Sequence, residues 1–303
     1  MLRRALLYLS ERKGLQQFLL RRRFAQRVAR RFVAGETLEE AMAVVRGLNE
    51  RGMKVTLDHL GEAVADRAAA SVAVEAYLAL LERIHREGVD SGISIKLTQL
   101  GLAIDEDLCM GHLRCIAEAA RKHDNFVRID MEAAEHVEAT LRLFGQLLPK
   151  YGRLGVVIQA YLRRSANDVR GLCELGAPVR LCKGAYRADE ERAFQSRKEI
   201  DDSFLDLLET LIRCGAPLAV ATHDSRMIEA ARRLKGNVDA SDGRFELQML
   251  YGVRRDLQAE IVRQGYRMRV YVPYGTEWYP YFMRRMAERP ANFLFVLRAL
   301  TGR

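Results

Sequence analysis

One short predicted helix near the C-terminus carries polar side chains where a helix normally buries apolar ones. Tyr281, Arg284, Arg285 and Glu288 follow the i, i+3, i+4, i+7 spacing that places residues on one face. Each arginine offers a planar guanidinium fork that matches a carboxylate or a phosphate. If this face points inward, the spacing predicts a site for a small anionic ligand; the alternative is a solvated face on an outer helix.

Two prolines set the limits of this helix. Pro280 suits a first turn, where its missing N–H is not needed, and Pro290 cannot continue the helix. A strand-like run at 269–273 comes just before it. The arginine pair is therefore expected to follow the carboxyl end of a strand.

The elements that must position this helix are short β-type runs that alternate with helix-type stretches from about residue 53 onward. Eight runs are predicted as strands: Lys54–Asp58, Ile93–Leu97, Phe126–Met131, Gly155–Ala160, Val179–Lys183, Leu218–Thr222, Arg244–Gln248 and Arg267–Val272. Helices are predicted between them at Ala68–Glu87, Leu108–His123, Glu135–Leu148, Ile200–Arg213, Ser225–Leu234 and Gly252–Arg263. Eight such units predict an α/β protein of the (βα)8 TIM-barrel class. A doubly wound open sheet is the alternative, but no GxGxxG turn follows the first strand.

Polar residues alternate with apolar ones along these strands. The apolar set suits the helix-covered outside, so the polar set must point into the barrel. The polar residues nearest the carboxyl ends of the strands are Lys96, Asp130, Gln159, Arg180 and Tyr271. Taken singly, Asp130 has an alternative role as a helix cap, Lys96 as a solvent-facing residue and Arg180 as a structural partner of Asp130. Together they predict a site for an anionic ligand at the barrel mouth, where barrel enzymes keep their active sites.

The absence of other motifs narrows the chemistry. No Walker, HExxH or GxSxG motif is present, so phosphoryl transfer, zinc hydrolysis and serine-hydrolase chemistry have no support, and no metal is expected. A redox cofactor would supply chemistry that these side chains lack. The five cysteines are odd in number and form no CxxC pair, which favours a reduced, intracellular compartment. No uncharged apolar run is long enough for a transmembrane helix.

The net charge of +9 is concentrated in residues 1–31. This arm holds ten Lys and Arg residues against one acidic residue, whereas the rest of the chain carries 39 of each sign. Apolar residues in the arm are spaced as in an amphipathic helix. The arm is typical of contact with an anionic membrane surface, with nucleic acid or of a transit sequence; the alternative is a surface helix docked on the main domain.

The residues above resemble the proline dehydrogenase family, in its short monofunctional bacterial form. The matching segments occur in family order and cover most of the chain after residue 50. They are Leu57–Glu62, Ser94–Leu97, Arg128–Glu132, Gln159–Tyr161, Val179–Tyr186, Ala221–Asp224, Phe245–Gly252 and Tyr271–Glu288. One motif alone would be weak evidence, but the ordered set is specific.

The resemblance implies a distorted (βα)8 barrel in residues 51–303, preceded by a basic helical arm in residues 1–50. It implies non-covalent FAD and oxidation of L-proline to 1-pyrroline-5-carboxylate, with a hydride passing to flavin N5 and electrons passing on to a membrane quinone. The protein is then expected to be cytoplasmic, peripheral on the inner face of the membrane. The DNA-binding and aldehyde dehydrogenase parts of bifunctional relatives are not expected.

The resemblance also assigns roles to residues of this chain. Arg284 and Arg285 would clamp the proline carboxylate together with Lys96, and Glu288 would hold the arginines in place. The pyrrolidine ring would be walled by Leu250, Tyr271 and Tyr281. The catalytic residues beside the flavin ring would be Asp130 and Arg180. The flavin contacts would be Met131, Gln159, Arg180, Lys183, Gly184, Ala185, Thr222 and His223.

Two other functions compete with this one. The first is another FAD-bearing barrel oxidoreductase, of the methylenetetrahydrofolate reductase type. The second is a basic nucleic-acid-binding protein that acts through the arm, although the main body is neutral and shows no RRM, KH or zinc signature. The loop at 187–191 is more charged than the family leads one to expect.

Overall fold

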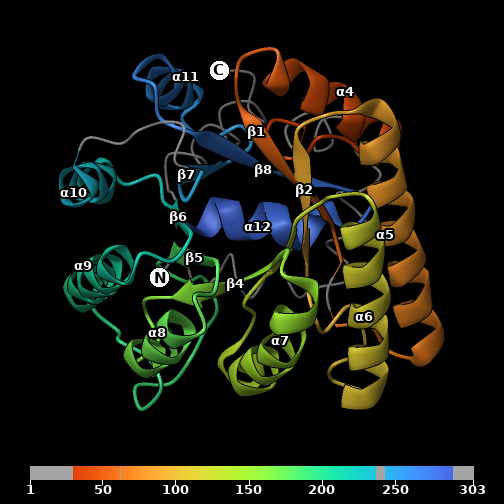
Figure 1. Ribbon diagram of the computed structural model, residues 1–303, viewed down its shortest axis with the longest axis horizontal. Coiled ribbons are helices and arrows are strands. Elements are labelled where there is room, and N and C mark those ends of the chain that lie inside the picture. Colours follow the sequence, from red (N-terminus) through yellow and green to blue (C-terminus); the bar gives the residue numbers. More distant parts are fainter. Residues whose placement is uncertain (1–29, 62, 237–242, 289–303) are drawn as a thin grey trace, which may run out of the picture.

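A closed barrel of eight parallel strands forms the centre of the molecule (Figure 1). The computed structural model describes residues 30–61, 63–236 and 243–288. The strands are β1 (Lys54–His59), β2 (Ser91–Ile95), β3 (Val127–Ile129), β4 (Leu154–Gln159), β5 (Val179–Cys182), β6 (Leu218–Ala221), β7 (Phe245–Leu250) and β8 (Met268–Tyr274). They pair in chain order, and β8 closes onto β1. The predicted barrel and all eight predicted strands are confirmed, with ends that shift by a few residues.

Helices connect the strands on the outside of the barrel, as Figure 1 shows. They are α5 (Arg67–Glu87), α6 (Glu106–Lys122), the 3-10 helix η1 (Ala134–His136), α7 (Val137–Tyr151), α8 (Ser165–Glu174), α9 (Arg197–Cys214), α10 (Ser225–Lys235) and α11 (Arg255–Arg263). The sequence did not predict α8, which is short and begins with small and polar residues. Another helix, α4 (Leu38–Asn49), precedes β1 inside the segment that was expected to form a helical arm, without predicted bounds.

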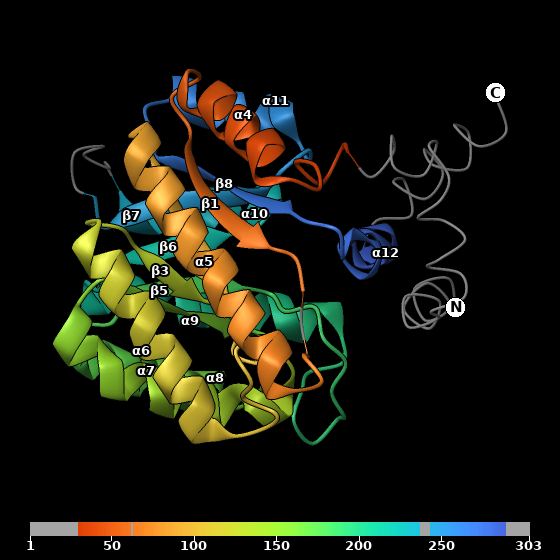
Figure 2. The same ribbon diagram turned by 90° about the vertical axis from the view of Figure 1, so that its right-hand side faces the viewer.

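The last described helix, α12 (Trp278–Glu288), lies at the barrel mouth. Figure 1 shows it across the middle of the barrel, and Figure 2 shows it beyond the carboxyl end of β1. Its third residue is Pro280, so the predicted first-turn position of that proline is confirmed. Pro290, predicted to end the helix, lies outside the described residues.

Local signals in the sequence start and stop the outer helices. Thr37 and Ser196 each form a capping box with the glutamate three residues later, so backbone N–H groups that the helix leaves unpaired are satisfied. Gly88 ends α5 with φ of +62°, a conformation that costs glycine little because it has no Cβ.

The apolar face of each strand is buried against the helices. The residues that share this face are Val55, Leu57, Ile93, Ile95, Val127, Ile129, Val156, Ile158, Val179, Leu181, Leu247, Val270 and Val272. Each is essentially inaccessible to solvent, and burial of such a side chain contributes roughly 1.5–3 kcal/mol. The polar faces therefore point into the barrel, as the alternation predicted.

The segment before the barrel is part of the same core. Met42 and Val45 of α4 are fully buried in the cluster that contains the outer faces of β1 and β8. The proposed boundary at residue 50 stays a prediction. Residues 1–29, which hold most of the basic arm, lie outside the described residues.

The cysteines differ from the expectation of reduced thiols. Cys173 at the end of α8 and Cys214 at the end of α9 form a disulfide, and their Cα atoms are 5.8 Å apart. The two residues are 41 positions apart in the sequence, so only the packing of α8 beside α9 brings them together. Cys109 and Cys115 are free thiols. Among the described helices, none has the length and apolar character needed to cross a membrane.

Candidate active site at the barrel mouth

Asp130 is the centre of a hydrogen-bonded network inside the barrel. It follows β3 and accepts hydrogen bonds from Ser94 of β2 at 2.8 Å and from Arg180 of β5 at 2.7 Å. Its second carboxylate oxygen accepts one from the Tyr271 hydroxyl of β8 at 2.7 Å. Three strands and the residue that follows a fourth thus contribute one side chain each to a single polar cluster. The sequence placed Asp130, Arg180 and Tyr271 together, and the structure confirms that they meet.

Arg180 and Tyr271 are also stacked, with the guanidinium carbon 5.3 Å from the ring centroid. Burial raises the pKa of Tyr271 well above its ordinary value, and the nearby Asp130 carboxylate raises it further. The phenol therefore remains a hydrogen-bond donor at any physiological pH. This stack fixes the plane of the guanidinium at the barrel mouth.

A second buried ion pair lies beside this network. The ammonium of Lys96 donates to the Asp58 carboxylate of β1 at 2.6 Å, and both residues are buried. Burial raises the pKa of Asp58, an effect that Lys96 opposes. Asp58 lies within a matching family segment, but it was not predicted as a site residue. Its inward position on β1 follows from the same alternation that identified Lys96, so that signal was present in the sequence.

The amino-terminal part of the barrel holds a further charged layer under the site. Arg269 of β8 donates to Glu246 of β7 at 2.8 Å. Arg128 of β3 donates to the carbonyl of Pro178 at 2.8 Å. Gly155 makes room for it, because a Cβ there would lie 2.4 Å from the Arg128 guanidinium. Burial lowers the pKa of Arg128 to about 9.

The Glu246–Arg269 pair predicts a loss of stability in acid. Burial opposes ionisation of Glu246, but Arg269 overcomes this and the pKa falls from 4.5 to about 2. A depressed folded-state pKa stabilises the fold above pH 4.5, and that stabilisation disappears as pH falls toward 2. The free energy of unfolding should decrease over this window by about 3 kcal/mol from this group.

Urea denaturation at several pH values measures this effect. Glu246→Gln should flatten the slope between pH 5 and 2: it lowers stability above pH 4.5, where Arg269 loses a charged buried partner, and approaches wild type near pH 2. Glu39→Gln is the matched control, since Glu39 is an exposed carboxylate on α4. An unchanged slope in Glu246→Gln would contradict the assignment.

Several buried polar atoms at the mouth have no hydrogen-bond partner among the described residues. They are Nε and Nη2 of Arg180, the hydroxyl of Tyr161 and Nδ1 of His59. Arg180 and Tyr161 are 5% and 6% exposed, so water does not readily satisfy them. Unsatisfied buried donors are rare in proteins and costly. They indicate a polar ligand that accepts hydrogen bonds at this mouth.

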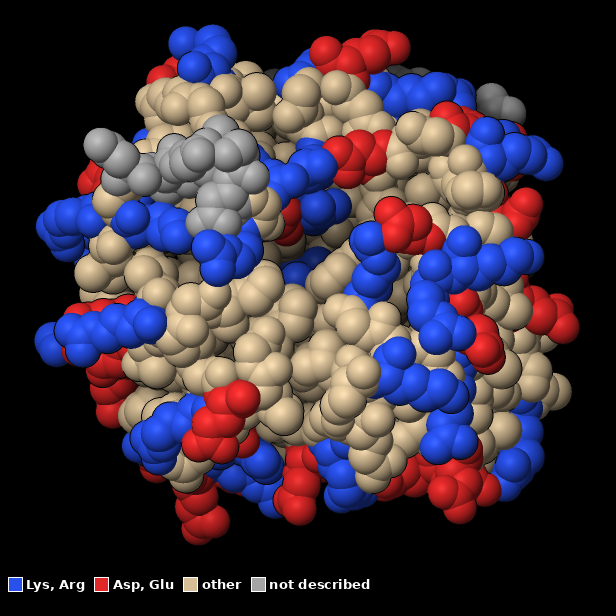
Figure 3. Space-filling view, viewed as in Figure 1, with Lys and Arg blue, Asp and Glu red and all other residues tan. Residues whose placement is uncertain are grey.

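Figure 3, in the orientation of Figure 1, shows the amino-terminal end of the barrel, opposite the mouth and α12. Lys and Arg side chains gather around a hollow near the centre of that face. At the mouth, the Lys183–Ala185 loop follows β5 at the carboxyl end of the barrel. Gly184 has φ of +101°, and a Cβ there would lie 2.2 Å from the ring of Tyr161. The glycine therefore leaves bare backbone next to an aromatic ring, a cradle in which a flat ligand can approach closely.

The remaining predicted flavin contacts surround the same mouth. Gln159 is buried and donates to the Glu132 carbonyl at 2.8 Å. Met131, two residues after the end of β3, is also buried. Thr222 is buried, and its hydroxyl accepts from the Asp224 N–H at 3.1 Å. His223 accepts from the N–H of Leu250 at 3.0 Å.

Lys183 has partners that the sequence did not suggest. Its ammonium lies 2.9 Å from Asp224, the N-cap of α10, and also forms an ion pair with Asp201 of α9. The lysine therefore ties the loop after β5 to two helices. Ala185 is partly buried in the same loop.

The stripe on α12 is only partly described. Tyr281 is buried, and the guanidinium carbon of Arg285 lies 5.1 Å from its ring centroid. The side chains of Arg284 and Glu288 lie outside the described part of the structure. Among the other predicted substrate contacts, Leu250 at the end of β7 is in register with Tyr271 of β8.

Comparison with known proteins agrees with this geometry. A family model described as proline dehydrogenase matches residues 41–298. This chain belongs to the proline dehydrogenase family. Proline dehydrogenase 1 of Bacillus subtilis (strain 168) is 42% identical over 301 residues, which cover 99% of both chains. The proline dehydrogenase of Deinococcus radiodurans is 37% identical, covering 98% of this chain and 97% of the relative.

Solved structures of longer proteins share the fold. A crystal structure of proline utilization A from Bdellovibrio bacteriovorus, inactivated by N-propargylglycine, superposes with a TM-score of 0.81 at 26% identity. The match covers 87% of this chain but only 33% of that one. The family match favours a proline dehydrogenase over the methylenetetrahydrofolate reductase type and over a nucleic-acid-binding protein.

Proposed function

We propose that this proline dehydrogenase holds FAD non-covalently at the barrel mouth and oxidises L-proline to 1-pyrroline-5-carboxylate. The observation that carries the proposal is the buried Arg180, which is anchored to Asp130 by one nitrogen while two others lack a partner among the described residues. This donor set fits the polar edge of a flavin ring. The bare backbone of Gly184 against Tyr161 fits its flat face.

Residues of several strands would hold the cofactor. Arg180 and Gln159 lie inside the mouth, and the Lys183–Ala185 loop forms one side of it. The remaining contacts that we assign to the flavin are Met131, Thr222 and His223. When bound, FAD supplies a two-electron acceptor for a hydride, chemistry that no side chain of this site provides.

The carboxylate of proline would be bound by cations above the cofactor. Arg284 and Arg285 would approach from α12 and Lys96 from the end of β2, while Glu288 would hold the arginines in place. Two guanidinium forks and an ammonium set the position and the plane of a carboxylate. Leu250, Tyr271 and Tyr281 would form the walls around the apolar part of the ring.

The protein contributes orientation and electrostatics to the reaction. Oxidation removes a hydride from C5 of proline and a proton from its nitrogen, so C5 must face the acceptor. Holding the carboxylate at the far side of the ring sets this orientation before the reaction. Arg180, fixed by Asp130 and stacked on Tyr271, places positive charge where negative charge develops. Asp130 and Arg180 are therefore the catalytic residues of the proposal.

Gly184→Ala tests the cradle. The added Cβ would overlap the Tyr161 ring, and the positive φ would be strained, so FAD affinity should fall by about tenfold or more. The ratio of flavin to protein absorbance after gel filtration measures it. Gly176→Ala is the matched control, because Gly176 has φ of +59° but no atom within 4 Å of an added Cβ. Equal flavin loss in both variants would mean that backbone strain alone is responsible.

The function itself is tested by the purified protein. It should be yellow, release its flavin into the supernatant on acid or heat precipitation, and bleach with L-proline under anaerobic conditions. Colour that stays with the precipitate would contradict a non-covalent cofactor. A bound flavin that L-proline does not reduce would contradict the proposed reaction.

We also propose that a membrane quinone reoxidises the enzyme and that the basic arm, residues 1–31, assists contact with anionic lipid on the cytoplasmic face. The arm's charge and amphipathic spacing support this proposal. Deleting the arm should weaken pelleting with anionic liposomes and turnover with a membrane quinone, while a soluble dye acceptor still works. Equal pelleting of both forms at low and high salt would contradict it.

A further inference from the structure

Residues 31–36, here called the strap, lie against the end of β8. The N–H of Ala34 donates to the Pro273 carbonyl at 2.8 Å, and the N–H of Gly275 donates to the Gly35 carbonyl at 3.0 Å. Phe32 is 2% exposed. The strap is therefore packed on the barrel next to the short connection that leads into α12.

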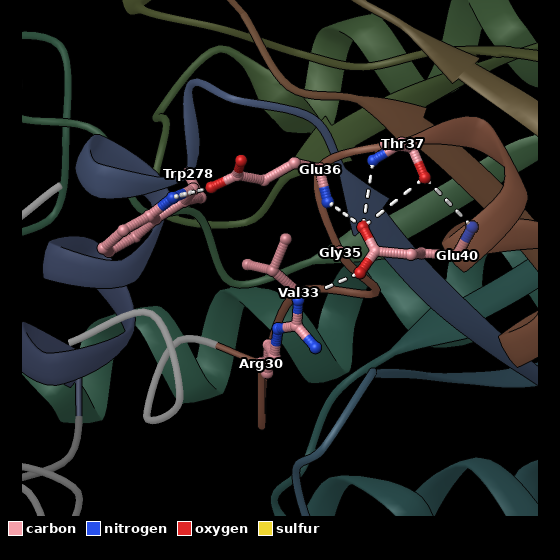
Figure 4. Close-up of a pocket in the computed structure, with 7 residues that line it drawn as sticks. All are labelled: Arg30, Val33, Gly35, Glu36, Thr37, Glu40 and Trp278. Atoms are coloured by element: carbon pink, nitrogen blue, oxygen red, sulfur yellow. Dashed lines mark hydrogen bonds and ion pairs between the residues drawn. The ribbon is translucent and has the colours of Figure 1, made fainter. Parts of the chain in front are cut away.

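The strap also holds the first turn of α12. The indole N–H of Trp278 donates to the Glu36 carboxylate at 3.1 Å, as Figure 4 shows. Phe282, one turn further along, lies edge-on to Trp278 with centroids 6.1 Å apart. Its other neighbour is Phe32, with a centroid distance of 6.3 Å. One hydrogen bond and a row of three aromatic rings thus join the strap to the helix.

The strap is itself anchored at α4. The backbone N–H of Glu36 donates to the Glu40 carboxylate at 2.8 Å, within the capping region that starts α4. A cavity of about 130 Å³ lies between the strap, the start of α4 and Trp278. Packing around the indole is incomplete there, so the hydrogen bond and ring contacts decide its position.

The face of α12 that contacts the strap also carries Arg285, which we propose to bind the substrate. Trp278, Phe282 and Arg285 are spaced i, i+4, i+7 and so lie on one stripe. A helix moves as a rigid unit, so a shift of Trp278 displaces Arg285 as well. A displacement at the strap contact would therefore also move Arg285.

We propose that Glu36 and Phe32 are positioning residues that hold α12, through Trp278 and Phe282, in the orientation that binds the substrate carboxylate. This inference rests on the proposed role of α12 in binding proline. Without the strap contacts, α12 would spend only a fraction of its time in the competent orientation. The apparent affinity for substrate would then fall by that fraction, while bound substrate would restore the orientation.

The kinetic test separates positioning from general stability. Glu36→Ala and Trp278→Phe should each raise KM for L-proline about fivefold, the equivalent of one hydrogen bond to a charged group at a partly exposed position, with kcat within about twofold. Glu36→Gln keeps an acceptor for the indole and should stay close to wild type. Glu39→Gln removes a neighbouring exposed charge that pairs with Arg83 instead, and should leave KM unchanged.

A double-mutant cycle with Arg285→Met gives the decisive comparison. If the strap acts through the arginine, Glu36→Ala should change kcat/KM by less than about twofold in the Arg285→Met background. Full additivity of the two changes would overturn the proposal. So would an unchanged KM in both Glu36→Ala and Trp278→Phe, or a flavin content that falls with KM.

Trp278 is the chain's single tryptophan, so its fluorescence reports on α12 without any turnover. Acrylamide should quench the flavin-loaded Glu36→Ala protein more strongly than wild type or Glu39→Gln, and a carboxylate-bearing ring analogue should restore shielding. Equal quenching in all three proteins would overturn the proposal. Altered quenching in a protein that does not oxidise L-proline would uphold the strap contact while refuting the proposed reaction.

Discussion

Arg285→Met is expected to lower kcat/KM for L-proline by roughly 30- to 1000-fold. A charge-assisted contact to a largely desolvated carboxylate contributes roughly 2–4 kcal/mol, and about 1.4 kcal/mol corresponds to a tenfold change. Arg284→Met should act in the same range. Steady-state kinetics with a soluble dye acceptor measures both variants.

Three further results are expected if Arg284 and Arg285 bind the substrate carboxylate. Flavin content should stay near wild type, because the arginines are assigned to the substrate. A ring analogue that carries a carboxylate should lose affinity in step with proline. Arg285→Lys should restore little, since an ammonium lacks the planar fork. An arginine whose replacement leaves kcat/KM unchanged, or releases flavin instead, is not a carboxylate ligand.

Arg180→Met is expected to lower the midpoint potential of the bound flavin by about 30–65 mV. Hydrogen bonds from a charged group contribute roughly 1.5–3 kcal/mol, and 30 mV corresponds to about 1.4 kcal/mol for a two-electron couple. The rate of anaerobic reduction by L-proline should fall by about 10²- to 10³-fold, as for the loss of a preorganised donor in other enzymes. Redox titration and stopped-flow absorbance measure the two quantities.

The control for Arg180→Met removes the unpaired charge of the Asp130 carboxylate. Removing Arg180 leaves the Asp130 carboxylate without its 2.7 Å cationic partner inside the barrel, which destabilises the fold. Asp130→Asn in the same chain should recover part of the melting temperature but not the potential. A potential that recovers together with stability would show that Arg180 is structural only.

The outline of the fold was predictable because its signals are local. Strand alternation has a period of two residues and helix periodicity one of 3.6, and both are fixed by backbone geometry within a few neighbours. Runs such as Ile93–Leu97 therefore indicated the strand and which of its side chains point into the barrel. The short α8 was missed because it begins with small and polar residues that also suit a loop.

The members of the polar cluster were also predictable, but most of their pairings were not. Lys96, Asp130, Arg180 and Tyr271 stand out because charge on a barrel interior is costly. Their partners depend on which strands face one another in the closed barrel. Asp58 was overlooked as the partner of Lys96, and Tyr161 was overlooked beside Gly184, although both lie in matching family segments.

The sequence by itself determined the barrel, the inward polar faces and the family of this protein. These follow from the order of the motifs and from the alternation of polar and apolar residues, which can be read directly from the chain. Only the tertiary structure decided that Tyr271 reaches Asp130 across 141 residues, that Cys173 meets Cys214, and that the strap holds α12. Barrel closure brings Tyr271 within hydrogen-bond distance of Asp130, the packing of α8 beside α9 joins the two cysteines, and the strap meets α12 beside the end of β8. No local pattern encodes these contacts, because each joins residues that are distant in the sequence.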